Sequence, residues 1–164
     1  MTALPGKLEV ASTQVYTFKT PDEARALAGE LASLCPDPER SRIGLMELLL
    51  NAVEHGNLAI SYAQKTELVE TFAFQSELER RLQLPEHGEK RATVSVTRTG
   101  GELQFLIQDQ GDGFDWSPYL EIDPTRVLHP HGRGIAWAKA VSFDRLEYRG
   151  RGNEVLAVIA IAAG

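Results

Sequence analysis

The sequence predicts an α+β fold, a two-layer sandwich in which helices cover one face of a mixed, mostly antiparallel sheet. The expected elements follow the order strand, helix, helix, charge-rich arm, two strands, long loop, helix, two strands, which is not the strict alternation of a parallel α/β fold. Two runs of period-2 alternation, "RATVSVTRT" and "ELQFLIQD", flank Gly100 and Gly101 and predict a hairpin. A chain of 164 residues has the length of one domain with one core. We therefore expect a single domain over residues 1 to 164.

The first strand and the first helix are predicted from local signals. The stretch "STQVYTFKT" alternates apolar and polar residues and is rich in β-branched and aromatic side chains, as strands are. Thr20 is a suitable N-cap, Pro21 suits the first helical position, and Glu23 is placed to close a capping box. A helix to about Leu34 is expected.

A second helix is predicted by the same cap-then-proline pattern at Asp37 and Pro38. This helix includes the stretch "ELLLNAVEHGN", and Gly56 with Asn57 supplies a suitable C-terminal cap. The helix is apolar over most of its circumference, so we expect it to be largely buried.

The remaining chain divides into an arm, a loop and a closing unit. Residues 62 to 91 are charge-rich with leucines at partly helical spacing, which indicates an inserted helical arm. Residues 110 to 133 contain several glycines and prolines with little periodicity, and loops of that length are usually functional or disordered. "GIAWAKAV" predicts a short helix, and two final strands are expected on either side of a turn at residues 150 to 153.

Composition excludes several classes of protein. The net charge of -6 argues against nucleic acid as the main partner, because such binding depends on clustered Lys and Arg. Cys35 is the single cysteine, so no internal disulfide can form and a reducing compartment is suitable. The sequence shows neither a secretory signal nor an apolar run long enough for a membrane span. We expect a cytoplasmic protein with no membrane partner.

Polar residues on the second helix are the first candidates for a functional site. Glu47, Asn51 and His55 are four residues apart and so lie on one face, with Glu54 beside them. A polar stripe on an ordinary helix usually faces solvent. On a helix this apolar, however, the stripe should border something polar that the fold provides, because buried carboxylates need partners.

Two glycine-rich segments supply candidates for that polar surface. "DQGDGFD" follows a predicted strand, and "HGRG" precedes a helix, whose N-terminus is a natural anion site. The first segment does not fit a calcium loop, since the third and fifth positions from Asp109 are glycine and the twelfth is Leu120. Neither a dinucleotide fingerprint nor a P-loop pattern is present.

Together, the order and spacing of these motifs resemble those of the Bergerat-fold (GHKL) ATPases, which include gyrase, heat-shock chaperone, histidine-kinase and mismatch-repair ATPase domains. Glu47-Leu-Leu-Leu-Asn51 is similar to the E-x-x-x-N helix motif, and Asp109-Gln-Gly111-Asp-Gly113 to D-x-G-x-G. Gly132-Arg-Gly134 is similar to the later glycine box, and Gly152-Asn153 is a looser counterpart of the turn before the last strand. The motifs span about residues 40 to 160.

The resemblance implies a role for each matching residue. It implies Glu47 as the general base, Asn51 as the ligand of Mg²⁺, and Asp109 as the acceptor of the adenine amino group of ATP. Such chemistry suits these side chains, because Mg²⁺ binds phosphate oxygens, waters and one or two protein oxygens, and a carboxylate can accept a hydroxyl proton.

The glycines are assigned by the same resemblance. Gly111 and Gly113 resemble the adenine-pocket loop, and Gly132, Arg133 and Gly134 the end of a long ATP lid that contacts phosphate. His129 and His131 also lie in this lid, where a metal site is a weaker interpretation than phosphate contacts or plain surface.

Within the superfamily, the pattern Asn51 to Gly56 is most similar to the N-A-x-x-H-G of bacterial anti-sigma-factor serine/threonine kinases. That resemblance implies a partner-switching kinase that phosphorylates an anti-anti-sigma (STAS-type) protein and sequesters a sigma factor or other regulator. Two alternatives stay open: an ATP-binding interaction module with little or no kinase activity, and a histidine-kinase catalytic domain. The arm is longer than in the compact anti-sigma kinases, and it could cover the core or form a homodimer or partner surface.

Overall fold

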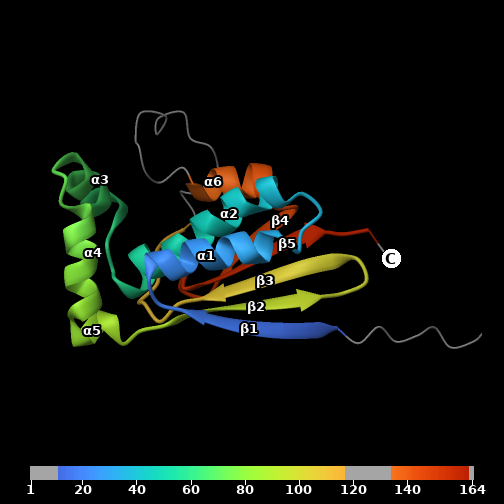
Figure 1. Cartoon of the computed structure of the whole chain (residues 1–164), viewed down its shortest axis with the longest axis horizontal. Coiled ribbons are helices and arrows are strands. Elements are labelled where there is room, and N and C mark those ends of the chain that lie inside the picture. The colour runs from blue at the N-terminus through green and yellow to red at the C-terminus, as the bar shows by residue number, and fades with distance from the viewer. Residues whose placement is uncertain (1–10, 117–133, 163–164) are drawn as a thin grey trace, which may run out of the picture.

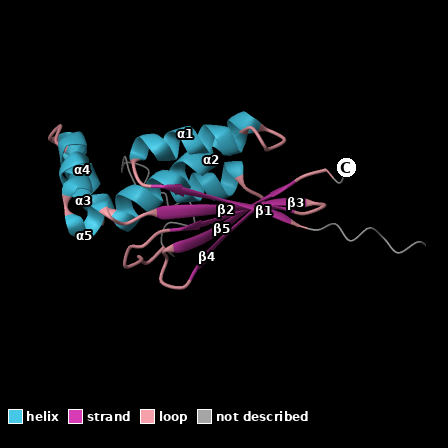
Figure 2. Ribbon diagram, turned by 60° about the horizontal axis from the view of Figure 1, so that its bottom comes forward, coloured by secondary structure: helices cyan, strands magenta, loops and turns pink. Residues whose placement is uncertain are grey.

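In the computed structural model, which describes residues 11 to 116 and 134 to 162, helices cover one face of a five-stranded sheet (Figures 1 and 2). The strand order is β1-β2-β3-β5-β4, and all four pairings between them are antiparallel. The predicted two-layer α+β sandwich is confirmed, although these strands form a purely antiparallel sheet and not a mixed one. The strands are β1 (Ser12–Phe18), β2 (Ala92–Arg98), β3 (Glu102–Gln108), β4 (Arg145–Arg149) and β5 (Glu154–Ala160).

The first two helices begin where their caps predict. Thr20 accepts a hydrogen bond from the Glu23 amide before α1 (Pro21–Ala32), and Asp37 accepts one from the Arg40 amide before α2 (Pro38–Asn51). Each bond satisfies one of the orphan amides of a first turn. The expected capping box is wrong in one detail: the Glu23 carboxylate accepts a hydrogen bond from the amide of Lys19, whereas a capping box would use the amide of the N-cap residue, Thr20. α2 continues without a break into the π-helical segment η1 (Ala52–Asn57).

The core lies between the helices and the sheet. β2 and β3 alternate buried and partly exposed residues along their length, so one face of each strand packs under the helices. α6 (Gly134–Trp137) and η4 (Ala138–Ser142) pack along α2 on this same layer. The largest fully buried side chains come from both layers, and they include Leu31, Leu45, Leu49, Phe105, Ile107 and Ile135.

The region of the predicted arm forms three helices at one end of the molecule (Figure 1): α3 (Tyr62–Glu70), α4 (Phe74–Gln83) and α5 (Pro85–Gly88). Leu78 of α4 is 2% exposed and belongs to the core cluster. Arg81 Nη1 donates to the carbonyl oxygens of Leu58 and Ala59 at 2.7 and 2.9 Å. The arm is therefore fastened to the segment that directly follows η1.

Candidate functional site

The polar stripe of α2 places Glu47 and Asn51 in contact. Asn51 Nδ2 donates a hydrogen bond to Glu47 Oε1 at 3.2 Å, one helical turn away. That bond occupies the amide nitrogen, so the amide oxygen of Asn51 is the atom that can coordinate a cation. The predicted pair of functional residues is thus assembled by the helix itself.

The environment of Glu47 makes it a better base than an exposed carboxylate. Burial raises the pKa of Glu47 above its usual value, and the hydrogen bond from Asn51 and the charge of Lys65 only partly oppose this effect. The nearby negative charge of Glu54 raises the same pKa further. A carboxylate with a raised pKa holds an abstracted proton more readily near neutral pH.

Glu54 has a separate, structural position. Its side chain is 2% exposed and pairs with Lys65 Nζ of the arm at 2.7 Å. A carboxylate this buried requires such a partner. Glu54 therefore ties α3 to η1, and it does not extend the polar stripe toward a ligand.

Gly56 is needed for packing, and the prediction that it caps the helix is wrong. The helix continues through Asn57, and the residue with positive φ at the exit is Ala59 (φ 56°). A Cβ on Gly56 would lie 2.4 Å from the carboxyl carbon of Asp109. Gly56 therefore allows the end of β3 to approach the helix, which brings Asp109 beside η1.

Asp109 is held in place by its own loop and by the turn before β5. Its Oδ1 accepts from the Gly111 amide at 2.8 Å, and its main-chain amide donates to the carbonyl of Asn153 at 3.0 Å. Asn153 Nδ2 also donates to the Asp109 carbonyl at 3.3 Å. Burial raises the pKa of Asp109 to about 6, with the Gly111 amide and the charge of Lys90 opposing it. The carboxyl group has a second oxygen to offer a ligand that donates a hydrogen bond.

The glycines after Asp109 allow close packing of the loop. A Cβ on Gly111 would lie 2.4 Å from the Gly56 carbonyl oxygen, and one on Gly113 (φ 84°) would lie 2.0 Å from that of Arg151. Only glycine adopts this φ without strain and leaves this space. Gly113 lines the pocket described next, whereas the Gly111 amide is already bonded to Asp109 and so is not free for a ligand.

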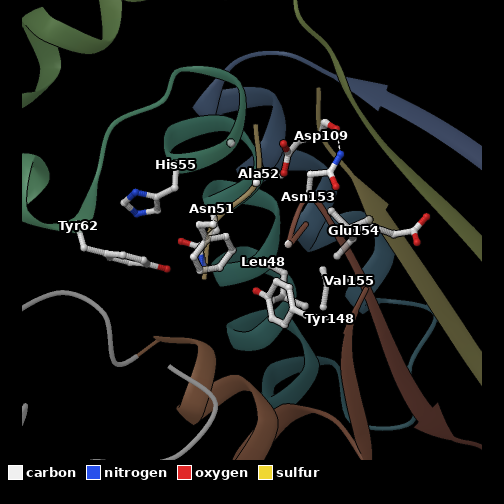
Figure 3. A pocket seen from close by; sticks show the side chains of 15 residues that line it. Leu48, Asn51, Ala52, His55, Tyr62, Asp109, Tyr148, Asn153, Glu154 and Val155 are labelled. Atoms are coloured by element: carbon white, nitrogen blue, oxygen red, sulfur yellow. Dashed lines mark hydrogen bonds between the residues drawn. The ribbon is translucent and has the colours of Figure 1, made fainter. Parts of the chain in front are cut away.

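These elements enclose a narrow pocket (Figure 3), and a wider cavity shares part of its lining. The narrow cavity has a volume of about 20 Å³, and the wider one of about 570 Å³. The wall common to both consists of His55, Gly56, Tyr62, Gly113 and Phe114. The narrow pocket is further lined by Leu48, Asn51, Ala52, Ile107, Asp109, Tyr148, Gly152, Asn153, Glu154 and Val155.

Aromatic rings that the motifs do not include form a row along this pocket. His55 stacks on Tyr62 with ring centroids 4.0 Å apart, and Tyr62 lies 6.4 Å from Phe114. Phe114 meets Tyr148 edge-on at 5.6 Å, and Tyr148 stacks with Trp116 at 5.7 Å. Sequence reasoning missed this row and assigned no chemistry to His55.

The other end of the site is formed by Gly134 and Glu47. A Cβ on Gly134 would lie 1.9 Å from the carboxyl carbon of Glu47, so the first residue of α6 rests directly on this carboxylate. The remaining predicted lid residues, Gly132 and Arg133, lie outside the described residues, as do His129 and His131. Their contact with phosphate stays a prediction.

The charges of Glu47 and Asp109 both act on Tyr148, which lines the narrow pocket. The pKa of the Tyr148 hydroxyl lies well above its usual range, first because the group is buried and then because of the negative charges of Glu47 and Asp109. Gly56, which contacts Asp109, follows Glu47 by nine residues along the helix, which corresponds to roughly 13 Å. Asp109 and Asn51 line the narrow pocket, and Glu47 lies one helical turn before Asn51 on the same face of the helix.

This geometry agrees with the family to which the chain belongs. Residues 19 to 159 match the family model of the histidine kinase-like ATPase domain, and the chain is a member of that family. None of the curated proteins matches the chain. Within residues 11 to 116 and 134 to 162, no helix is long and apolar enough to span a membrane.

The residues present suit ATP and Mg²⁺, the ligands usual for such domains. No cluster of three or more potential metal-ligating side chains occurs in the described part of the chain. Mg²⁺ would therefore depend on the Asn51 oxygen together with phosphate oxygens and water, which is the kind of coordination that this ion accepts. The free oxygen of Asp109 matches the exocyclic amino group of adenine.

Proposed function

We propose that the chain is an ATP-dependent protein serine/threonine kinase of a bacterial partner-switching system. Its substrate would be an anti-anti-sigma (STAS-type) protein, and it would otherwise hold a sigma factor or another regulator. The observation that supports transfer most is the contact between the partly buried Glu47, the amide of Asn51 and Gly134. This contact supports the assignment of Glu47 as the base that acts next to the terminal phosphate.

In the proposed reaction, each side chain has one task. Asp109 accepts a hydrogen bond from the adenine amino group and so favours ATP over GTP, which has a carbonyl there. Asn51 holds Mg²⁺, which would neutralise charge on the phosphate oxygens. Glu47 accepts the proton of a serine hydroxyl while the oxygen of that hydroxyl bonds to the γ-phosphorus. The bond from that phosphorus to the β–γ bridging oxygen breaks, and ADP leaves with the electron pair.

The raised pKa of Glu47 supports this assignment because a base must retain the proton that it removes. The hydrogen bond from Asn51 and the close approach of Gly134 both restrict the Glu47 carboxylate. Fixing a reacting group in this way is a large part of what enzymes contribute to phosphoryl transfer.

The test is transfer of labelled phosphate. The chain is incubated with ATP labelled at the γ-phosphate, Mg²⁺ and small STAS-type proteins, and the label is traced to a partner serine or threonine. We expect transfer by the wild type and its loss in Glu47→Gln, with ATP binding retained. Binding of ATP without transfer to any such protein would contradict the kinase assignment and favour an interaction module. Acid-labile labelling of the chain itself would instead indicate histidine chemistry.

A further inference from the structure

Tyr62 connects the arm to the pocket. It is the first residue of α3, and its side chain extends to the pocket from the arm side of the chain (Figure 3). Its ring stacks on His55 at an interplanar angle of 31° and lies near Phe114. Both the narrow and the wide cavity are lined by this ring. An inserted segment therefore supplies part of the wall that separates them.

The arm holds Tyr62 firmly. Ser61 and Gln64 form a complete capping box at the start of α3, with bonds of 3.1 and 2.9 Å. Lys65, one turn later, pairs with the buried Glu54 of η1. Arg81 of α4 donates hydrogen bonds to the carbonyl oxygens of residues 58 and 59. The position of the Tyr62 ring is thus set by the docking of the whole arm.

The size of the two cavities shows why this ring matters. A cavity of about 20 Å³ has room for about one water molecule and none for a purine. The adjoining 570 Å³ lies within the range of ligand pockets. A base that reaches Asp109 must therefore displace or pass between the rings of the shared wall, and a flat ring in contact with Tyr62 is the favourable arrangement.

We propose that Tyr62 stacks on the adenine of bound ATP, so that the arm forms part of the nucleotide site and its docking sets ATP affinity. This inference rests on the proposed binding of ATP, and it adds a contact between the adenine and a residue that lies outside the three motifs. When an aromatic side chain that stacks on a base is removed, affinity falls about 5- to 150-fold.

The first test compares ATP dissociation constants by calorimetry. Tyr62→Leu should bind ATP about 5- to 150-fold more weakly than the wild type, whereas Tyr62→Phe, which keeps the ring, should bind within about twofold. Phe72→Ser is the matched control, because Phe72 lies in the same arm and is 97% exposed. This control should bind like the wild type. Equal affinity of Tyr62→Leu and the wild type would overturn the inference.

The second test perturbs the docking of the arm and leaves the pocket intact. Arg81→Gln shortens the side chain that binds the two carbonyls and should weaken ATP binding several-fold, although Arg81 does not line the pocket. An unchanged dissociation constant in a variant whose arm has lost protection in hydrogen exchange would contradict coupling through the arm.

A third measurement does not depend on removing a ring from the wall. In Tyr62→Trp, ATP should quench indole fluorescence more than in the wild type, whose Trp116 and Trp137 supply the reference. Identical quenching in both proteins would count against a base on residue 62. Failure of the wild type itself to bind ATP would defeat the proposed function, whereas wild-type binding with no effect at residue 62 would defeat only this inference.

Discussion

Asp109→Asn should affect ATP binding and stability in opposite directions. The substitution preserves the shape of the side chain and removes its charge. One oxygen must still accept from the Gly111 amide, so the position of the other oxygen becomes a donor that faces the adenine amino group. Losing a hydrogen bond to a charged group costs about 1.5 to 3 kcal/mol, which weakens ATP binding about 10- to 150-fold.

The stability effect follows from the raised pKa. The pKa of Asp109 rises from 3.8 to about 6 on folding. Between pH 4 and 6 the folded state therefore binds a proton at this carboxylate more readily than the unfolded state does. Stability from this group is therefore highest below pH 4 and falls as the pH rises to 6. At pH 8, Asp109→Asn should be more stable than the wild type. The pKa shift sets an upper limit of about 3 kcal/mol, and the difference should be smaller because the carboxylate is partly exposed to water.

Two assays test the argument about Asp109. Calorimetric titration gives the ATP dissociation constant, and urea unfolding at pH 8 and pH 4 gives the two stabilities. In the wild type, ATP affinity should also fall as the pH drops below about 6, by a total of about 10- to 150-fold, because protonation removes the charge of the carboxylate that ATP binds. Unchanged ATP affinity in the variant would show that Asp109 does not bind the adenine, and lower stability than the wild type at pH 8 would show that its charge is not costly in the folded state.

Three further substitutions test other parts of the structure. Gly134→Ala should push the Glu47 carboxylate aside and lower the rate of phosphate transfer up to about 100-fold, with little change in the urea midpoint; an unchanged rate would contradict the contact. Lys65→Met should leave the buried Glu54 unpaired and lower the free energy of unfolding in urea by about 3 to 5 kcal/mol. Adding Glu54→Gln should recover most of this loss, and a wild-type midpoint for the single variant would argue against the ion pair. Leu78→Ala should cost about 2 to 5 kcal/mol by the same measurement, and a loss below about 1 kcal/mol would show that the arm does not share the core.

Local signals predicted much of the fold. Thr20 and Asp37 start their helices as expected, because a cap and a following proline act within one turn. The function of Gly56 was not predictable in this way. Its neighbour is Asp109, 53 positions later in the chain, and only the folded structure shows that a Cβ would collide with that carboxyl group.

The candidate site was predictable where a motif defines it. Glu47 and Asn51 are one turn apart on one helix, and the glycines beside Asp109 mark its loop, so the sequence alone singles them out. The aromatic wall could not be found this way. Tyr62 and Phe114 come from segments that meet only through tertiary packing, and neither lies in a recognisable spacing.

The most direct test of the central claim is a crystal structure of the chain with Mg²⁺ and a non-hydrolysable ATP analogue. We expect the adenine amino group on Asp109, the metal ion on the Asn51 oxygen, and the terminal phosphate beside Glu47 and Gly134. A nucleotide bound elsewhere, or bound with its base at the Glu47 end, would contradict this claim.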